Sequence, residues 1–303
     1  MKKNNILNYK ILKNIQFFPY IFNFITNNQI NLLATMPKSG TWYCQYFFWT
    51  LDKILENKTF NILDYNFKKN EVGHIINVKR KIFIGHATCP GYEFEDDDLH
   101  KKKWNSLKFW HNGFDWVNKE IDMNYCPQIN PHTRIVYIYR DPLSQIFSSY
   151  NYAKNHTDKY QRECSQQKLI DFYLNVSAVN SYIKQYHTFC YMKKLYPQNI
   201  RLIKYKDLIE NPNKFFLEIC NFYNILNTND KNKECIDLAI KSSSIENLKL
   251  LEKKNGYSLA NDGTRSTHIQ GTKFSSYKEF LTKNDIEKIE KIFNRFSYSL
   301  KNF

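Results

Sequence analysis

The stretch from residue 30 to residue 55 constrains the fold more than any other part of the sequence. It begins with a short apolar run, Ile30 to Met36, which is typical of a buried strand. A small polar loop, Pro37 to Thr41, follows, and Trp42 to Leu55 then repeats apolar residues at helical spacing. A strand, a loop and a helix in this order direct backbone N–H groups and a helix N-terminus at one spot, where an anion can bind.

The residues of this loop suit a phosphate or a sulfate. Gly40 lets the backbone approach a ligand closely, and Lys38 adds a positive point charge. Ser39 and Thr41 add hydroxyl donors. The loop lacks the first glycine of the Walker pattern, so it is a different kind of phosphate loop. The alternative is an ordinary strand–helix turn, and only the other motifs of the chain can distinguish the two.

Length, charge and cysteine content limit the function classes. The 303 residues and 17% aromatic content fit one α/β domain with a substantial core. The net charge of +15 favours anionic ligands, but the basic residues form only short runs such as Lys101–Lys103, so we expect no nucleic-acid partner. The seven cysteines form no C-x-x-C pair, which fits a reducing, cytoplasmic location and argues against a zinc site; we expect no metal.

Residues 1–29 are interpreted as an N-terminal lead-in to a single domain over residues 30–303. The apolar run from Phe17 to Ile25 is interrupted by Pro19 and Asn23 and is too short to span a bilayer. No small-x-small cleavage site follows it, which argues against a signal peptide. We therefore expect no transmembrane segment, with weak contact to a membrane surface as the alternative.

Further strands and helices alternate along the chain. Apolar runs predict strands at 81–88, 134–140 and 200–205. Helical patterns follow at 142 onward, 167–196, 212 onward, 233–241, 244–253 and 284–296, with a loop over 256–276. Short buried strands alternating with helices predict an α/β domain with a central parallel sheet flanked by helices, in which the first loop binds phosphate.

Chemically useful groups cluster at the predicted strand ends, where ligands of parallel sheets bind. His86 and Arg140 end two of these strands, as the loop ends the first. Asp141 and Pro142 then supply an N-cap and a first helical residue, and Ser148 lies on the second turn. A guanidinium and a hydroxyl so placed can hold one phosphate from two sides. A salt bridge for Arg140 and helix packing for Ser148 are the alternatives.

Four segments resemble motifs of the PAPS-dependent sulfotransferase family of the cytosolic type, where PAPS is 3′-phosphoadenosine-5′-phosphosulfate. Pro37–Thr41 is similar to its 5′-phosphosulfate loop. The other three are similar to the 3′-phosphate motif, the strand and turn beside the adenine, and the segment that flanks the base: Tyr137–Pro142 with Ser148 and Ser149, Lys204–Leu208 with Glu210–Pro212, and Ser242–Leu248. Their order and spacing match over roughly residues 30–282.

The resemblance implies a role for each matched residue. It gives three groups of nucleotide-binding residues: Pro37, Lys38, Ser39, Gly40 and Thr41 for the 5′-phosphosulfate, Arg140 and Ser148 for the 3′-phosphate, and Tyr43, Tyr205, Ser243 and Ile245 for the adenine. His86 falls at the position of the family's catalytic base. Lys38 would stabilise the charge of the leaving oxygen during in-line sulfuryl transfer to a hydroxyl or amine of a small acceptor.

The chain departs from the family pattern in three places. After the loop, Trp42 and Tyr43 replace a threonine and the tryptophan that stacks on adenine. Ile84 stands where a lysine commonly precedes the catalytic histidine. In the C-terminal motif Gln270 replaces an arginine; a shift of one residue aligns Gly271 with the motif glycine but supplies no basic pair. Three basic residues nearby are candidate replacements: Arg265, His268 and Lys273.

Two other functions are left open. A nucleotide-dependent phosphoryl transferase would need a magnesium-binding aspartate after a strand, and Asp141 is better explained as an N-cap. A homologue that binds PAPS or its product PAP without catalysis is favoured by Ile84 and opposed by Lys38 and His86. The acceptor itself is not readable from the sequence, and a homodimer is an open alternative.

Overall fold

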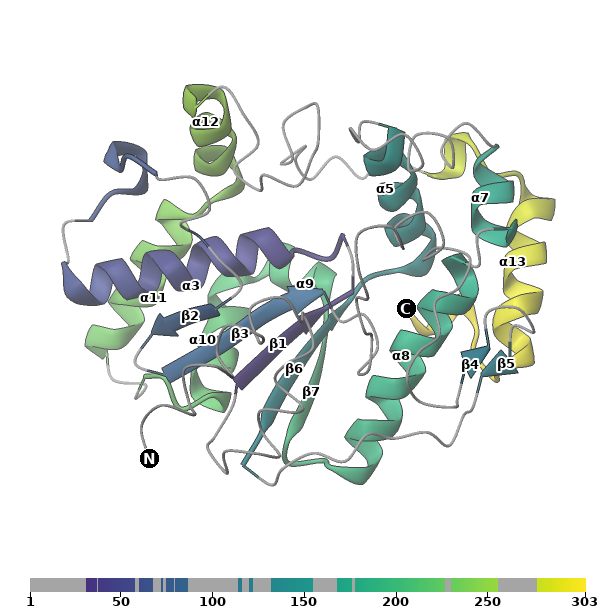
Figure 1. Cartoon of the computed structure of the whole chain (residues 1–303), viewed down its shortest axis with the longest axis horizontal. Helices are drawn as coiled ribbons and strands as arrows, with labels where there is room; N and C mark the ends of the chain where they lie inside the picture. Colours follow the sequence, from purple (N-terminus) through teal and green to yellow (C-terminus); the bar gives the residue numbers. More distant parts are fainter. Residues whose placement is uncertain are drawn as a thin grey trace, which may run out of the picture.

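The computed structural model of the chain describes residues 31–36, 38–57, 60–67, 72, 75–78, 80–86, 114–115, 120–121, 132–154, 168–175, 178–226, 230–255 and 277–303. A five-stranded sheet lies at its centre (Figure 1). Across the sheet the strands are β2 (Ile75–Val78), β3 (Arg80–His86), β1 (Asn31–Thr35), β6 (Arg134–Tyr139) and β7 (Ile200–Lys204). A separate ribbon pairs β4 (Phe114–Asp115) with β5 (Glu120–Ile121).

Four strands of the central sheet run parallel, which confirms the predicted α/β fold. β1 pairs with β3 and β6, and β6 pairs with β7, all in parallel. The edge strand β2 is antiparallel to β3, in a stretch where we predicted no strand. Thr35 is in register with both His86 and Ile138, and Tyr139 with Lys204. The carboxyl ends of the parallel strands therefore meet at one edge, where a ligand would bind.

Helices cover both faces of the sheet (Figure 1). On one side lie α3 (Thr41–Glu56), α9 (Tyr205–Glu210), α10 (Pro212–Phe222), α11 (Asp230–Ser242), α12 (Ile245–Asn255) and the short η1 (Ile62–Asp64). On the other lie α5 (Pro142–Lys154), α7 (Leu169–Asn175), α8 (Ala178–Leu195), α13 (Lys283–Arg295), η3 (Tyr277–Glu279) and η4 (Leu300–Asn302).

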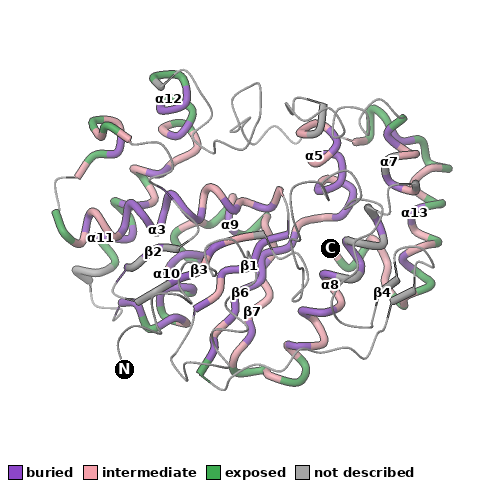
Figure 2. The backbone as a smooth tube through the Cα atoms, in the orientation of Figure 1, coloured by how far each residue is buried: buried purple, intermediate pink, exposed green. Residues whose placement is uncertain are grey.

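The side chains of β6 divide the core between these two layers. Val136 and Ile138 belong to the hydrophobic cluster on the α3 side, whereas Ile135, Tyr137 and Tyr139 belong to the cluster on the α8 side. This division follows from the period of two in a strand. All residues of β1 and β6 except Leu32 and Arg134 are buried (Figure 2), because each of these strands has a neighbouring strand on both sides and a helical layer on each face.

Local sequence signals set several helix starts as predicted. The Asp141 carboxylate accepts a hydrogen bond from the Ser144 N–H at 2.7 Å, ahead of α5. Pro212 stands at the start of α10, where its missing N–H costs nothing. The pattern over residues 167–196, which we expected to form one long helix, instead forms the two helices α7 and α8.

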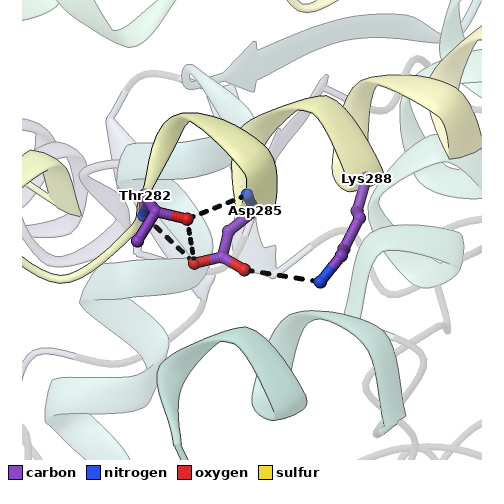
Figure 3. A network of polar contacts seen from close by, with 3 residues as sticks. All are labelled: Thr282, Asp285 and Lys288. Atoms are coloured by element: carbon purple, nitrogen blue, oxygen red, sulfur yellow. Dashed lines mark hydrogen bonds and ion pairs between the residues drawn. The ribbon is translucent and has the colours of Figure 1, made fainter.

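A reciprocal capping box starts α13, close to the predicted start at residue 284 (Figure 3). The Asp285 N–H donates to the Thr282 hydroxyl oxygen at 3.2 Å, and the Thr282 N–H donates to the Asp285 carboxylate at 3.0 Å. Lys288 lies 3.8 Å from the same carboxylate. These bonds lower the pKa of Asp285, because they favour its charged form.

The cysteines in the described residues are free thiols. Cys44, Cys220 and Cys235 are buried free thiols, and Cys190 is partly buried and also free. Within the described ranges, no helix combines the length and apolar character that a bilayer crossing requires. Residues 1–29 lie outside the described residues, so their interpretation as a lead-in stays a prediction.

Candidate functional site

The loop between β1 and α3 turns through two left-handed residues. Lys38 has φ 63° and Gly40 has φ 86°, and the Ser39 N–H donates to the Met36 carbonyl at 3.0 Å. A lysine at positive φ is uncommon and is characteristic of functional turns. Gly40 is the N-cap residue of α3 and has no side chain to cap the helix. The cap residue therefore does not compete with a bound anion for the first N–H groups of the helix.

The side chains packed around Gly40 leave no room for a larger residue at this position. A Cβ atom there would lie 2.8 Å from Leu208 Cδ2 and 3.0 Å from Tyr205 Cε2. These side chains come from α9, which begins directly after β7. The loop and Tyr205, predicted to serve the same nucleotide, are therefore packed against each other.

The loop hydroxyls have different partners. The Thr35 hydroxyl donates to the Gly85 carbonyl at 3.2 Å and lies 2.5 Å from the Thr41 hydroxyl. Because a hydroxyl has a single proton, Thr41 must donate to Thr35. Ser39 Oγ is buried and has no hydrogen-bond partner among the described residues. A buried polar atom of this kind is costly unless it is satisfied, and an anionic oxygen at the loop would satisfy it.

Arg140 links the end of β6 to the loop. Its Nη1 donates to the Lys38 carbonyl at 3.1 Å, and its guanidinium carbon lies 5.1 Å from the centre of the Tyr205 ring. The Tyr182 hydroxyl on α8 donates to the Arg140 carbonyl at 2.5 Å. Burial lowers the pKa of Arg140 below its ordinary value, although a guanidinium stays charged in proteins. Ser148, the predicted partner of Arg140, is partly buried on the second turn of α5.

The ammonium group of Lys38 lies over an aromatic ring. Lys38 Nζ is 4.0 Å from the centre of the Tyr152 ring, near the end of α5. Sequence reasoning missed Tyr152. It missed Tyr182 as well. Tyr152 follows Ser148 by one helical turn, so the spacing rule for helix faces could have found it. Tyr182 lies on a distant helix, and no local pattern pointed to it.

The predicted adenine-binding residues gather around the start of α3. The Tyr43 ring packs edge-on against Phe216 with ring centres 5.5 Å apart. Burial is the main cause that raises the pKa of Tyr43, and the nearby Cys44, Glu246 and Tyr205 raise it further.

Three other predicted residues lie at helix ends: Ser243 just after α11, Ile245 at the start of α12 and Trp42 at the start of α3. Ser243 is buried and donates to the Ala239 carbonyl at 2.7 Å, so its hydroxyl proton is already used. Ile245 opens α12 and is partly buried. Trp42 is partly buried and packs on the core beside Tyr46, with ring centres 6.5 Å apart.

His86 is the last residue of β3, in register with Thr35 at the end of β1. Hydrogen bonds hold the strand just before it, from Thr35 to the Gly85 carbonyl and from Gln45 to the Ile84 carbonyl at 3.3 Å. The Ile84 side chain is buried in the core, so this position supplies no charge to the site.

Several predicted site residues lie outside the part of the chain that the structure describes. The His86 side chain and four other residues are among them: Pro37, Arg265, Gln270 and Gly271. The same holds for residues 87–113 and for the predicted loop over residues 256–276. Within the described ranges, no group of three or more His, Cys, Asp or Glu residues is placed to hold a metal ion.

A parallel α/β sheet with an anion-binding loop at its carboxyl edge defines a class of proteins that bind phosphate- or sulfate-bearing ligands. The family model of the sulfotransferase domain matches residues 30–302. The chain therefore belongs to the sulfotransferase domain family, which confirms the resemblance.

Two known proteins illustrate how distant the relatives are. Cytosolic sulfotransferase 17 of Arabidopsis thaliana is 23% identical over 205 residues, which cover 65% of this chain and 57% of that protein. The match thus spans little more than half the length of this relative. The crystal structure of mouse sulfotransferase SULT7A1 complexed with PAP has a TM-score of 0.51 and 15% identity, and the match covers 88% of this chain and 83% of that chain. It supports the fold.

Proposed function

We propose that the protein transfers a sulfuryl group from PAPS to a hydroxyl or amine of a small acceptor. The observation that carries this proposal is the hydrogen bond from Arg140 Nη1 to the Lys38 carbonyl at 3.1 Å. It joins two cationic, donor-rich places at one edge of the sheet, as a ligand with two separate anionic groups requires. A nucleotide with phosphates on both its 3′ and 5′ oxygens has this character.

The residues present fit such a nucleotide. Ser39 Oγ, buried without a partner among the described residues, would bond the 5′-phosphosulfate together with the N–H groups of Gly40 and Thr41. Arg140 and Ser148 would hold the 3′-phosphate. The adenine would lie among the residues around the start of α3, α9 and α12: Trp42, Tyr43, Tyr205, Ser243 and Ile245.

Two residues would carry the chemistry. When bound, PAPS would supply the sulfuryl group. His86 would accept the proton that the acceptor hydroxyl loses, since an imidazole titrates near neutral pH. Lys38 would place positive charge where the leaving phosphate oxygen becomes negative. Because Ile84 is buried and apolar, Lys38 carries more of this task here than in relatives with a lysine at that position.

The remaining features of the proposal follow the family pattern. The reaction would need no metal, because fixed cations and N–H groups can stabilise the charge. One of Arg265, Gln270 and Gly271, or a basic neighbour, would complete the 3′-phosphate site. We further propose a cytoplasmic protein with a small-molecule acceptor and no nucleic-acid partner. Whether it acts as a homodimer can be tested by light scattering.

Calorimetry with PAP, ATP and 5′-AMP tests the nucleotide assignment. We expect PAP to bind at least tenfold more tightly than 5′-AMP, since only PAP has the 3′-phosphate for Arg140 and Ser148. Tight binding of ATP with no preference for a 3′-phosphate would overturn the proposal and favour a phosphoryl transferase.

Turnover tests the two catalytic roles. With PAPS and 4-nitrophenol as a probe acceptor, His86→Ala should lower kcat by about 10²- to 10⁴-fold, the range for a general base. Lys38→Ala should also lower kcat, while both variants keep their affinity for the adenosine part of PAP. Full turnover by His86→Ala would show that another group is the base. A wild-type protein that binds PAP but transfers nothing to a wide panel of phenols, alcohols and amines would favour the non-catalytic homologue.

A further inference from the structure

We propose that Tyr152 is a positioning residue for Lys38: its ring holds the lysine ammonium in place for the 5′-phosphate end of the nucleotide. The inference rests on the proposed function of the loop. Its basis is the distance of 4.0 Å between Lys38 Nζ and the centre of the Tyr152 ring. This is well within the range at which a cation is attracted to an aromatic face.

The backbone of Lys38 is fixed, but its side chain needs a further constraint. Its backbone is left-handed, with φ 63°, and its carbonyl oxygen accepts a hydrogen bond from Arg140. The four-carbon stem beyond Cα still has many rotamers, and ordering it costs conformational entropy. An aromatic face beside the ammonium selects the rotamers that place the charge at the ring. Lys38 and Tyr152 are both partly buried, which strengthens the attraction relative to an exposed pair.

The ring also fixes the side of the loop on which the charge lies. Tyr152 belongs to α5, the helix that carries Ser148 one turn earlier and begins beside Arg140. The ammonium is therefore drawn toward the same helix that would hold the 3′-phosphate. In this proposal the Tyr152 ring acts on the ligand through its contact with Lys38. It should change affinity and rate only as long as Lys38 is present.

A double-mutant cycle on PAP affinity, measured by calorimetry, tests this dependence. In the Lys38 background, Tyr152→Leu should weaken PAP binding by about 2- to 30-fold, the range of cation–π interactions. In the Lys38→Ala background the same substitution should change PAP affinity by less than about twofold. Tyr152→Phe keeps the ring and should bind PAP like the wild type. With PAPS and 4-nitrophenol, kcat should follow the same pattern.

Tyr150→Leu is the matched control, because Tyr150 is a buried tyrosine of the same helix in the core of the α8 side. Its effect on PAP affinity should be equal with and without Lys38. The inference is overturned if Tyr152→Leu has the same effect in both backgrounds, if it has none, or if Tyr152→Phe is as damaging as Tyr152→Leu. Each of these results leaves the proposed function standing, provided that the wild type prefers PAP to 5′-AMP. A wild type without that preference refutes both together.

Discussion

The two halves of the candidate site are built in different ways. The half for the 5′ end comes from one continuous stretch, β1, the loop and α3, and its turn is closed by bonds between near neighbours such as Ser39 and Met36. The half around Arg140 depends on partners from distant parts of the chain, namely Lys38, Tyr182 and Tyr205. The first half is therefore encoded mainly by its own stretch of sequence, whereas the second forms only when α8 and α9 are packed in place.

Of the substitutions considered, Arg140→Ala should weaken the half of the site around Arg140 the most. The substitution removes a charged donor from the 3′-phosphate and leaves the Lys38 carbonyl without its bond from Arg140. We expect PAP binding to weaken by about 3 to 4 kcal/mol, which is several hundredfold, in calorimetry. Arg140→Lys keeps the charge but loses the planar fork, so it should recover only part of the affinity.

The affinity for 5′-AMP shows whether the two halves are independent. Since 5′-AMP lacks the 3′-phosphate, Arg140→Ala affects it only through the bond to the Lys38 carbonyl. We expect a loss of about threefold to tenfold, which corresponds to one ordinary hydrogen bond after competition with water, because the bond acts on the ligand only through the loop. An unchanged affinity for 5′-AMP would mean that Arg140 does not support the loop.

Gly40→Ala should destabilise the half of the site formed by β1, the loop and α3. An alanine would have to adopt φ 86° and place its Cβ 2.8 Å from Leu208 Cδ2. The left-handed conformation and the crowding together should lower the free energy of unfolding by about 2 to 3 kcal/mol, measured by urea denaturation. In a Leu208→Ala background the contact with Leu208 is relieved, while the contact with Tyr205 and the backbone strain stay, so the cost of Gly40→Ala should shrink by about 1 kcal/mol. Equal costs in both backgrounds would mean that the contact with Leu208 contributes nothing.

This contrast also explains what the sequence could predict. The parallel sheet, the loop and the cap at Asp141 follow from apolar periodicity and from turn chemistry, which act between near neighbours. The antiparallel edge strand β2 and the break between α7 and α8 were not predicted, because both depend on what packs against them. Tyr182 was missed for the same reason. The family motifs predicted Arg140 and Tyr205 as site residues, but no sequence pattern predicted that the two side chains would contact each other.

Tyr182→Phe should weaken the half of the site around Arg140 less than Arg140→Ala does. It removes the hydroxyl that donates to the Arg140 carbonyl at 2.5 Å. Burial raises the pKa of Tyr182, so the phenol is a protonated donor at all ordinary pH values. We expect about 1 to 1.5 kcal/mol less stability and PAP binding that is weaker by about threefold to fivefold.

Tyr223→Phe is the control for this change. Tyr223 is equally buried and donates to the Leu32 carbonyl at 2.6 Å, near the start of β1 and away from the carboxyl edge. It should lower stability by a similar amount and leave PAP affinity unchanged. If both variants weaken PAP binding equally, the Tyr182 bond stabilises the fold without a specific effect on Arg140.

Thr282→Ala should have the smallest effect, because the capping box of α13 is local like the loop but remote from the site (Figure 3). Loss of the cap should lower Tm by about 2 °C in calorimetric scans and leave PAP affinity unchanged. The bonds from Thr282 lower the folded pKa of Asp285 below its ordinary 3.8, so their contribution is fully present above that pH and is lost as pH falls through the folded value. The difference in Tm between the wild type and Thr282→Ala should thus be constant from pH 7 to about pH 5 and shrink in stronger acid. A difference that grows in acid would mean that Asp285 is better stabilised when protonated, which contradicts the capping geometry. A change in PAP affinity would mean that even this local element is coupled to the assembled half of the site.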